Sequence, residues 1–192
     1  MVKRAFDVAA SGVGLVVLSP LLAVVALMVG VSSHGPIIFR QVRVGRADTR
    51  FEILKFRTMR PSECGPEVTS AGDSRITPVG AVLRATKLDE LPQLVNVLRG
   101  EMSLVGPRPE VPSLARHWAP EQAAVILSVR PGITDPASIR FRDESAQMGV
   151  QDDPEAYYID TILPEKAAMY VDYVLHRTFV GDLRLIWQTV TG

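Results

Sequence analysis

The sequence is poor in the residues that build disulfide frameworks and transition-metal sites. Its 192 residues include one cysteine, Cys64, so neither an intrachain disulfide nor a cysteine-based zinc site can form. The three histidines, His34, His117 and His176, are too scattered along the chain to suggest a metal cluster. These shortages favour a protein whose functional side faces a reducing compartment.

Several common catalytic motifs are also missing. The chain has no glycine-rich phosphate loop with its lysine, no Gly-x-Gly-x-x-Gly, no His-Glu-x-x-His and no Gly-x-Ser-x-Gly, which excludes the usual nucleotide, protease and hydrolase templates. No basic run is interleaved with aromatic residues, so nucleic acid is not an expected partner.

The net charge of zero conceals an asymmetry. Residues 1–60 contain nine Lys or Arg and three acids, whereas residues 61–192 contain twelve Lys or Arg and eighteen acids. The basic part lies beside an apolar stretch, which favours anionic lipid head groups as its partner.

That apolar stretch runs from Val8 to Val31, and no residue between Asp7 and His34 carries a formal charge. Its length is that of a membrane segment. A secretory signal peptide is the alternative, but the segment is long for such a peptide and ends without a clear small-x-small cleavage site. We therefore expect residues 1–34 to form a membrane element.

Ser19-Pro20, near the middle of this segment, predicts a break. Pro20 removes a backbone donor and disfavours helix at Ser19, which leaves two arms of roughly 18 Å each, too short for the ~30 Å hydrocarbon core. Basic residues flank the segment on both sides: Lys3 and Arg4 before it, and Arg40, Arg43, Arg46 and Arg50 after it. The positive-inside rule places both flanks on the cytoplasmic face, so we expect a re-entrant helix. A spanning helix with a proline kink is the alternative.

Residues 35–192 are expected to form a compact cytoplasmic body of the α+β class, mainly helical. Residues Ile37–Val44 and Phe51–Met59 predict a β-hairpin, and residues 61–78, rich in Pro, Ser, Gly and acids, predict a loop suited to a flexible lid. Further helices are predicted over 112–129 and over 165–190, the second amphipathic, interfacial and broken near Gly181. Trp118 and Trp187 could each lie at a membrane interface or pack in the core, and core packing is the favoured prediction for both.

A short helix is predicted from Asp89 to Arg99, with Asp89 as its N-cap and Gly100 just past its end. Arg84 and Lys87 precede the carboxylate pair Asp89-Glu90. Carboxylates bind Mg²⁺ through hard oxygens, and an aspartate can itself attack phosphorus. A helix start favours an ionised aspartate and offers N–H groups to phosphate. By spacing alone, a simple N-cap at Asp89 followed by a first-turn acid at Glu90 is the favoured interpretation.

Three more cations are candidates for phosphate binding. Lys55 and Arg57 lie at the end of the predicted hairpin, and Arg108 lies between two prolines in Gly106-Pro107-Arg108-Pro109. A rigidly held arginine suits bidentate contact with phosphate or carboxylate. Taken singly, each could equally be a surface charge or part of a structural ion pair.

Together these segments resemble one family, the bacterial sugar transferases, which are monotopic polyprenyl-phosphate sugar-1-phosphate transferases (small phosphoglycosyl transferases). The resemblance covers nearly the whole chain. It rests on these motifs: Lys3-Arg4-Ala5-Phe6-Asp7, Ser19-Pro20, Gly35-Pro36-Ile37-Ile38-Phe39-Arg40-Gln41, Lys55-Phe56-Arg57-Thr58-Met59, Arg84-Ala85-Thr86-Lys87-Leu88-Asp89-Glu90-Leu91-Pro92-Gln93-Leu94, Asn96-Val97-Leu98-Arg99-Gly100, Met102-Ser103-Leu104-Val105-Gly106-Pro107-Arg108-Pro109-Glu110 and Arg130-Pro131-Gly132-Ile133-Thr134.

The resemblance implies a re-entrant membrane helix and a catalytic body on the cytoplasmic face of the bacterial inner membrane. It implies that a nucleotide-diphosphate sugar, most often a UDP-sugar, yields its sugar-1-phosphate to undecaprenyl phosphate and releases UMP, with Mg²⁺ required. Such a reaction is the first membrane step of polysaccharide or glycoconjugate synthesis. A homodimer is a further expectation, since some relatives self-associate, although nothing in this sequence demonstrates it.

Carried over by position, Asp89 is implied to be the nucleophile of a phosphosugar-enzyme intermediate and a metal ligand, with Glu90 as its catalytic partner and second metal ligand. Lys55, Arg84 and Arg108 match basic positions of the family and are implied to hold phosphates. Arg57 and Lys87 are carried as further substrate-binding candidates.

Residues 135–144 depart from the commonest family pattern, in which Pro-Gly-Ile-Thr is followed by Gly, an aromatic residue and Gln. This departure does not change the expected reaction, but it leaves open which sugar the enzyme transfers. Two alternative functions also stay open: a membrane-anchored scaffold without enzymatic activity, and a metal-dependent lipid pyrophosphatase.

Overall fold

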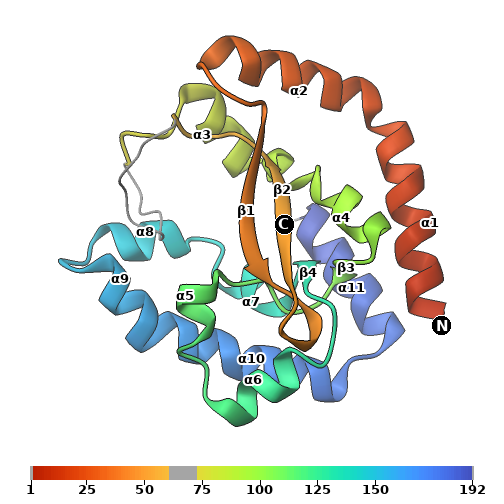
Figure 1. Ribbon diagram of the computed structural model, residues 1–192, viewed down its shortest axis with the longest axis vertical. Helices are drawn as coiled ribbons and strands as arrows, with labels where there is room; N and C mark the ends of the chain where they lie inside the picture. The colour runs from red at the N-terminus through yellow and green to blue at the C-terminus, as the bar shows by residue number, and fades with distance from the viewer. Residues whose placement is uncertain (1, 61–72, 192) are drawn as a thin grey trace.

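The computed structural model describes residues 2–60 and 73–191, and most of these are helical (Figure 1). The α-helices are α1 Val2–Val17, α2 Ser19–Ser32, α3 Pro78–Ala85, α4 Gln93–Arg99, α5 Pro112–Ala115, α6 Pro120–Ile126, α7 Pro136–Arg140, α8 Glu144–Gly149, α9 Pro154–Tyr157, α10 Leu163–His176 and α11 Phe179–Thr191. The strands are β1 Ile38–Val44, β2 Arg50–Phe56, β3 Ser103–Val105 and β4 Gly132–Thr134, and short helical turns lie at η1 Arg46–Asp48, η2 Leu88–Glu90 and η3 Tyr158–Ile162. A mainly helical chain with small sheets agrees with the predicted class.

The two N-terminal helices run along the outer edge of the molecule and bend by 65° where they meet (Figure 1). The bend falls at the predicted place, because α2 begins at Ser19 and has Pro20 in its first turn. The Ser19 hydroxyl donates to the Val16 carbonyl at 2.8 Å, which satisfies an acceptor near the end of α1. Within residues 2–60 and 73–191, a stretch long and apolar enough to cross a membrane is found only when α1 and α2 are counted together.

The predicted hairpin is present as the antiparallel pair β1–β2, which runs through the centre of the molecule (Figure 1). Its register pairs Ile38 with Phe56 at the open end and Val44 with Arg50 at the turn. Ala47 and Asp48 have positive φ angles of 53° and 58° in this turn.

Helix α2 packs directly on this open end. Val25 and Val29 of α2 are buried against Phe56 of β2 and Leu83 of α3, with Leu88 at the margin of the same cluster. Burial of apolar area of this kind stabilises the contact by about 25 cal/mol per Å². The second half of the bent pair is therefore fixed to the hairpin and to α3.

Helix α1 packs on α4 and β3 through polar as well as apolar contacts. Arg4 donates to the Val97 carbonyl at 2.8 Å, at the C-terminal end of α4, where a cation is favoured by the helix dipole. Asp7 is buried and accepts a hydrogen bond from the Ser103 hydroxyl of β3 at 2.8 Å. A charged residue within an apolar helix is thereby satisfied by the body of the protein.

A parallel pair of three-residue strands, β3 and β4, was not predicted. Ser103 lies opposite Gly132, and Val105 lies opposite Thr134. A β-carbon on Gly132 would lie 2.1 Å from the backbone nitrogen of Gly106, so this approach requires glycine. The pair brings together two of the segments that carry the family resemblance.

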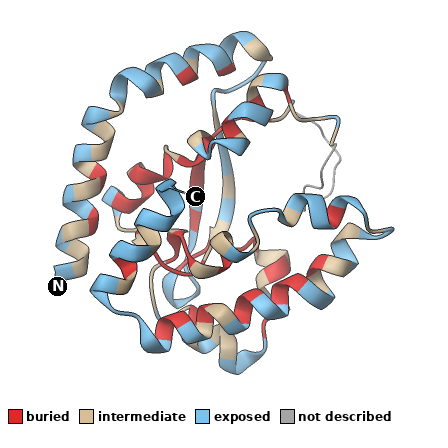
Figure 2. Ribbon diagram, turned by 180° about the vertical axis from the view of Figure 1, so that it is seen from behind, coloured by how far each residue is buried: buried red, intermediate tan, exposed pale blue. Residues whose placement is uncertain are grey.

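The remaining core lies around α10, whose inward side is buried while its outer side is exposed (Figure 2). Its largest cluster gathers residues from several elements: Val111, Leu114, Trp118, Ile126, Ala137, Met148, Tyr158, Ile162, Leu163, Ala167 and Tyr170. Core packing is thus confirmed for Trp118 and wrong for Trp187, which is exposed.

Two helix predictions need correction. The helix expected over 112–129 is two helices, α5 and α6, because Pro120 disfavours helix at Ala119. The helix expected over 165–190 is divided before Phe179 rather than near Gly181. The Thr178 hydroxyl accepts a hydrogen bond from the Gly181 N–H at 3.0 Å, so Thr178 caps α11 and Gly181 lies inside it.

The loop predicted over residues 61–78 is described only in part. Residues 61–72 lie outside the described residues, so the lid prediction is not tested. Helix α3 begins at Pro78, the last residue of the predicted loop, and the Thr77 hydroxyl caps it by accepting from the Gly80 N–H at 2.9 Å.

Candidate active site

The carboxylate pair lies on a short 3-10 turn, η2, between α3 and α4. Lys87 precedes this turn with a left-handed backbone, φ 57° and ψ 13°. The prediction that Asp89 is the N-cap of the next helix is wrong, because that helix, α4, begins at Gln93 after Pro92. Neither η2, whose N-cap residue is Lys87, nor α4, whose N-cap residue is Pro92, has a side-chain cap hydrogen bond. Gly100 ends the helix as predicted, with φ 85°.

Asp89 is a buried carboxylate with an unsatisfied oxygen. The residue is 7% exposed, and its Oδ1 has no hydrogen-bond partner among the described residues. Burial, together with the neighbouring charge of Glu90, raises the pKa of Asp89, although Lys55, Arg84 and Arg108 oppose the rise. A buried acceptor left unsatisfied costs on the order of 1–3 kcal/mol, which marks it as a functional candidate.

Glu90, by contrast, is fully engaged. Its Oε1 accepts from Lys55 Nζ at 2.9 Å and from Arg108 Nη2 at 2.6 Å. Burial alone would raise the pKa of Glu90, but the attraction of Arg108 and Lys55 and their hydrogen bonds outweigh it and hold the pKa far below its usual range. Glu90 therefore holds two cations next to the free carboxylate of Asp89.

The two cations that Glu90 holds come from opposite sides of the site. Lys55 lies near the end of β2, and burial lowers its pKa while the charge of Glu90 opposes that change. Arg108 lies on the segment that follows β3, and the charge of Glu90 raises its pKa further. Prolines on both sides fix the backbone at Arg108, which orients the guanidinium.

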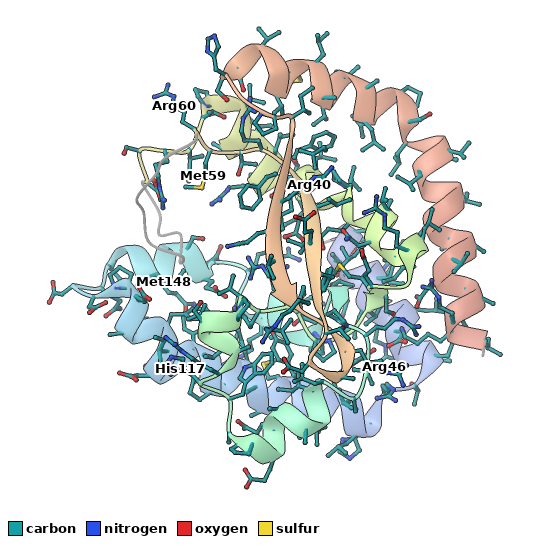
Figure 3. All side chains as sticks on the ribbon, in the orientation of Figure 1. Arg40, Arg46, Met59, Arg60, His117 and Met148 are labelled. Atoms are coloured by element: carbon teal, nitrogen blue, oxygen red, sulfur yellow. The ribbon has the colours of Figure 1, made fainter. Side chains whose placement is uncertain are left out.

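Arg84 approaches the site from the last turn of α3. Its Nε donates to the Thr58 hydroxyl at 3.0 Å, and its Nη2 contacts the Met59 sulfur at 3.2 Å. Met59 is seen beside α3 in Figure 3. Burial lowers the pKa of Arg84, and the charge of Asp89 opposes this, so the two opposite charges attract one another. Arg84 is the third cation around Asp89.

Two predicted substrate-binding residues are not brought into this cluster. Arg57 is buried, but its guanidinium bonds the end of α2, where it donates to the carbonyls of Val29 and Ser33 at 3.2 and 2.6 Å. Lys87 is exposed and sets the backbone before η2. The structure thus brings together Asp89, Glu90, Lys55, Arg84 and Arg108, and places Arg57 and Lys87 outside them.

One buried acid behind the cluster was not singled out from the sequence. Asp135 is fully buried and caps α7 by accepting from the Ser138 N–H at 2.8 Å. Burial raises the pKa of Asp135, while its hydrogen bonds from Ser138 and the charge of Arg108 oppose the rise. The signal was present as Asp-Pro before a helix, a common N-cap pattern.

The arrangement suits chemistry on phosphate groups. Three cations surround one carboxylate that is free to act as a nucleophile or a ligand, and phosphoryl transfer depends on charge neutralisation and positioning of this kind. No group of three or more metal-ligating side chains occurs in the described part of the chain. Magnesium, however, is usually bound by one or two carboxylates together with substrate phosphates, so the free oxygen of Asp89 is compatible with it.

A buried carboxylate among three cations suits an enzyme that acts on phosphate groups. The chain belongs to the bacterial sugar transferase family, whose model matches residues 1–192.

Curated relatives are similar over almost the whole chain. A UDP-glucose:undecaprenyl-phosphate glucose-1-phosphate transferase of Caulobacter vibrioides is 40% identical over 193 residues, which cover 98% of this chain and 68% of the relative. An exopolysaccharide production protein, PSS, of Rhizobium leguminosarum bv. phaseoli is 38% identical over 100% of this chain and 94% of its own length. A transferase of Escherichia coli with the same name as the first is 43% identical over 99% of this chain and 39% of its own length. The chain thus spans most of some relatives and well under half of others.

Proposed function

We propose that this enzyme transfers a sugar-1-phosphate from a nucleotide-diphosphate sugar, with a UDP-sugar as the expected donor, to undecaprenyl phosphate. Relatives of Caulobacter vibrioides and Escherichia coli are named UDP-glucose:undecaprenyl-phosphate glucose-1-phosphate transferases, and two other relatives are named exopolysaccharide production proteins. The observation that carries the proposal is the contrast at η2, where Glu90 is ion-paired twice and the Oδ1 of Asp89 is unpartnered among the described residues.

In the first half-reaction an Asp89 carboxylate oxygen attacks the phosphorus that bears the sugar. A bond forms between that oxygen and phosphorus, the bond to the bridging oxygen breaks, and UMP leaves with the bonding electron pair. In the second half-reaction an oxygen of the lipid phosphate attacks the same phosphorus, and the Asp89 carboxylate leaves. The product is a lipid diphosphate sugar, and the enzyme returns to its starting state.

The cations have distinct supporting roles in this scheme. Lys55 and Arg108 are held by Glu90 at the site, so they neutralise phosphate oxygens without needing to be reoriented. Arg84 faces Asp89 from α3 and favours its ionised form. Asp89 and Glu90 would hold Mg²⁺. The ion would neutralise further negative charge on the diphosphate.

The bent pair α1–α2 would lie in the cytoplasmic leaflet of the bacterial inner membrane as a re-entrant, monotopic element. Support comes from its length, its apolar composition and its 65° bend. Labelling tests this placement: cysteines introduced on the two flanks, at Lys3 and at Arg40, should react from one side of the membrane only. Reaction from opposite sides would establish a spanning helix instead.

The test of the reaction is UMP release from a panel of UDP-sugars in membranes, with undecaprenyl phosphate and Mg²⁺ each omitted in turn. Sustained release that needs both, with one sugar preferred, supports the proposal and names the donor. Lipid-diphosphate cleavage without any nucleotide sugar would favour the pyrophosphatase, and no turnover with any nucleotide donor would favour the scaffold.

The covalent step has its own test. Intact-protein mass spectrometry after mixing with donor alone should show an added sugar phosphate, and Asp89→Asn should abolish it. Asp153→Asn is the matched control, because Asp153 caps the distant helix α9 by accepting from the Ala156 N–H at 3.0 Å. Turnover by the wild type with no adduct under any quench would contradict a covalent intermediate.

A further inference from the structure

Arg57 binds the C-terminal end of α2. Its Nη2 donates to the Val29 and Ser33 carbonyls at 3.2 and 2.6 Å, its Nε donates to the Ser33 hydroxyl at 3.1 Å, and its Nη1 donates to the Pro36 carbonyl. The last carbonyls of a helix have no partner inside it and carry partial negative charge, so a buried guanidinium satisfies and stabilises them. Arg57 is thus a clamp between the end of α2 and the end of the hairpin.

The residues on either side of Arg57 hold the candidate active site. Lys55, two residues before it, pairs with Glu90, and Thr58, directly after it, accepts from Arg84. About 10 Å of extended backbone connects Lys55 to Thr58, so the clamp lies on the same short segment as Lys55 and as the hydroxyl that bonds Arg84. The clamp therefore fixes the end of α2 relative to Lys55 and to the hydroxyl that bonds Arg84.

The apolar contacts of α2 lead to the same residues. Val25 and Val29 of α2 pack on Phe56 and Leu83, with Leu88 at the margin. Phe56 precedes Arg57 in the chain, Leu83 precedes Arg84, and Leu88 precedes Asp89. Three apolar partners of α2 are thus sequence neighbours of the clamp or of a site residue, and closely packed interiors transmit strain.

We propose that Arg57 is a positioning residue that fixes α2 in register with the phosphate-handling side chains and so sets how far the site reaches toward a lipid phosphate at the membrane surface. The inference rests on the proposed function, because it requires a donor in solution and an acceptor in the membrane. Donor cleavage needs only the cluster around Asp89. Transfer to the lipid also needs that cluster at a fixed height above the membrane.

The test separates the two half-reactions in Arg57→Ala, studied as the full chain in nanodiscs. We expect the donor-only release of UMP, one equivalent per enzyme, to keep its rate within about twofold, and kcat/KM for undecaprenyl phosphate in the bilayer to fall by roughly 10- to 100-fold, the size typical of a misplacement near 1 Å. Transfer to a short-chain, water-soluble polyprenyl phosphate should change no more than donor cleavage does. Arg57→Lys, which retains a cation, should recover part of the loss.

Arg40→Ala is the matched control. Arg40 lies on the same hairpin but is more than half exposed and pairs only with Glu52 among the described residues, so all three rates should match the wild type. Equal losses in all three rates for Arg57→Ala and Arg57→Lys would overturn the inference in favour of a general structural role. Unchanged rates for both variants would overturn it as well. Failure of the wild type to release UMP from any donor would instead refute the proposed function.

Discussion

Asp89 and Glu90 are neighbours in the chain, both buried, and their environments drive their pKa values in opposite directions. The pKa of Asp89 is raised by burial and by Glu90, whereas the pKa of Glu90 is held far below its usual range by Arg108 and Lys55. Pairs of titratable groups that are driven apart in this way are typical of sites where one group acts and the other organises. Glu90 organises the cations, and its negative charge also adds to the rise that burial causes in the pKa of Asp89.

Asp89→Asn is expected to stabilise the protein at neutral pH. Because the folded pKa is raised above the usual 3.8, the wild type loses stability as the pH rises through the raised value, and the variant does not. A gain of about 1 kcal/mol would raise the melting temperature by roughly 2–4 °C in a chain of this size. Thermal unfolding at pH 7.5 and at acidic pH measures it, and the difference should shrink toward acidic pH. A variant less stable than the wild type at pH 7.5 would contradict the argument.

Glu90→Gln is expected to destabilise the protein strongly. The substitution leaves Lys55 and Arg108 buried with unpaired charge, which costs on the order of 3–5 kcal/mol. The contribution of Glu90 is present above its usual pKa and is lost as the pH falls through the lowered value, so the deficit should persist across neutral and mildly acidic pH. Denaturant unfolding measures it.

Glu52→Gln controls for the general loss of a carboxylate on the hairpin. Glu52 pairs with Arg40 at 3.4 Å, and both side chains are more than half exposed, so the change should stay within about 1 kcal/mol. Similar losses for the two variants would show that the pairs at Glu90 are no stronger than a surface contact.

The pH dependence of donor cleavage should report on Asp89. The nucleophile must be ionised, so the rate should fall as the pH is lowered through the raised pKa, and the midpoint should lie above the usual 3.8. Glu90 stays ionised throughout this window, and one ionisation should therefore describe the acidic limb. Single-turnover UMP release from pH 4.5 to 8 measures it. A rate that stays constant down to the pH of unfolding would contradict the assignment.

Gly80→Ala should impair both stability and activity. A β-carbon at this position would lie 2.0 Å from the Thr58 carbonyl oxygen, so α3 must move away from the residue that bonds Arg84. We expect a cost of about 1–3 kcal/mol and a slower donor cleavage. Gly12→Ala is the control, because a β-carbon there meets no atom within 4 Å and alanine favours the helix. Wild-type rates in Gly80→Ala would show that the position of α3 does not matter to the site.

The sequence was sufficient for features that depend on local patterns. The hairpin followed from two β-rich runs around a turn, the bend from Ser19-Pro20, and the end of α4 from Gly100. The strands β3 and β4 were missed because three residues carry no periodicity, and their pairing is decided by long-range contacts.

The sequence predicted most of the residues of the candidate site, but it did not predict how their side chains are arranged. Lys55 and Arg57 are cations two residues apart in one motif, yet the first pairs with Glu90 and the second with the end of α2. Asp89 was read as an N-cap because its spacing fits one, but the left-handed backbone at Lys87 starts a separate turn. Such differences depend on which neighbour a side chain meets in space, and one sequence does not contain that information.

The ion pair between Lys3 and Asp182, 2.6 Å long, joins residues that are 179 positions apart. At typical synthesis rates of 5–20 residues per second, α1 exists for roughly 10–40 s before Asp182 is made. The N-terminal helix must therefore find its first surroundings without this partner. The contact can form only after Asp182 has been made, and it then joins α1 to α11.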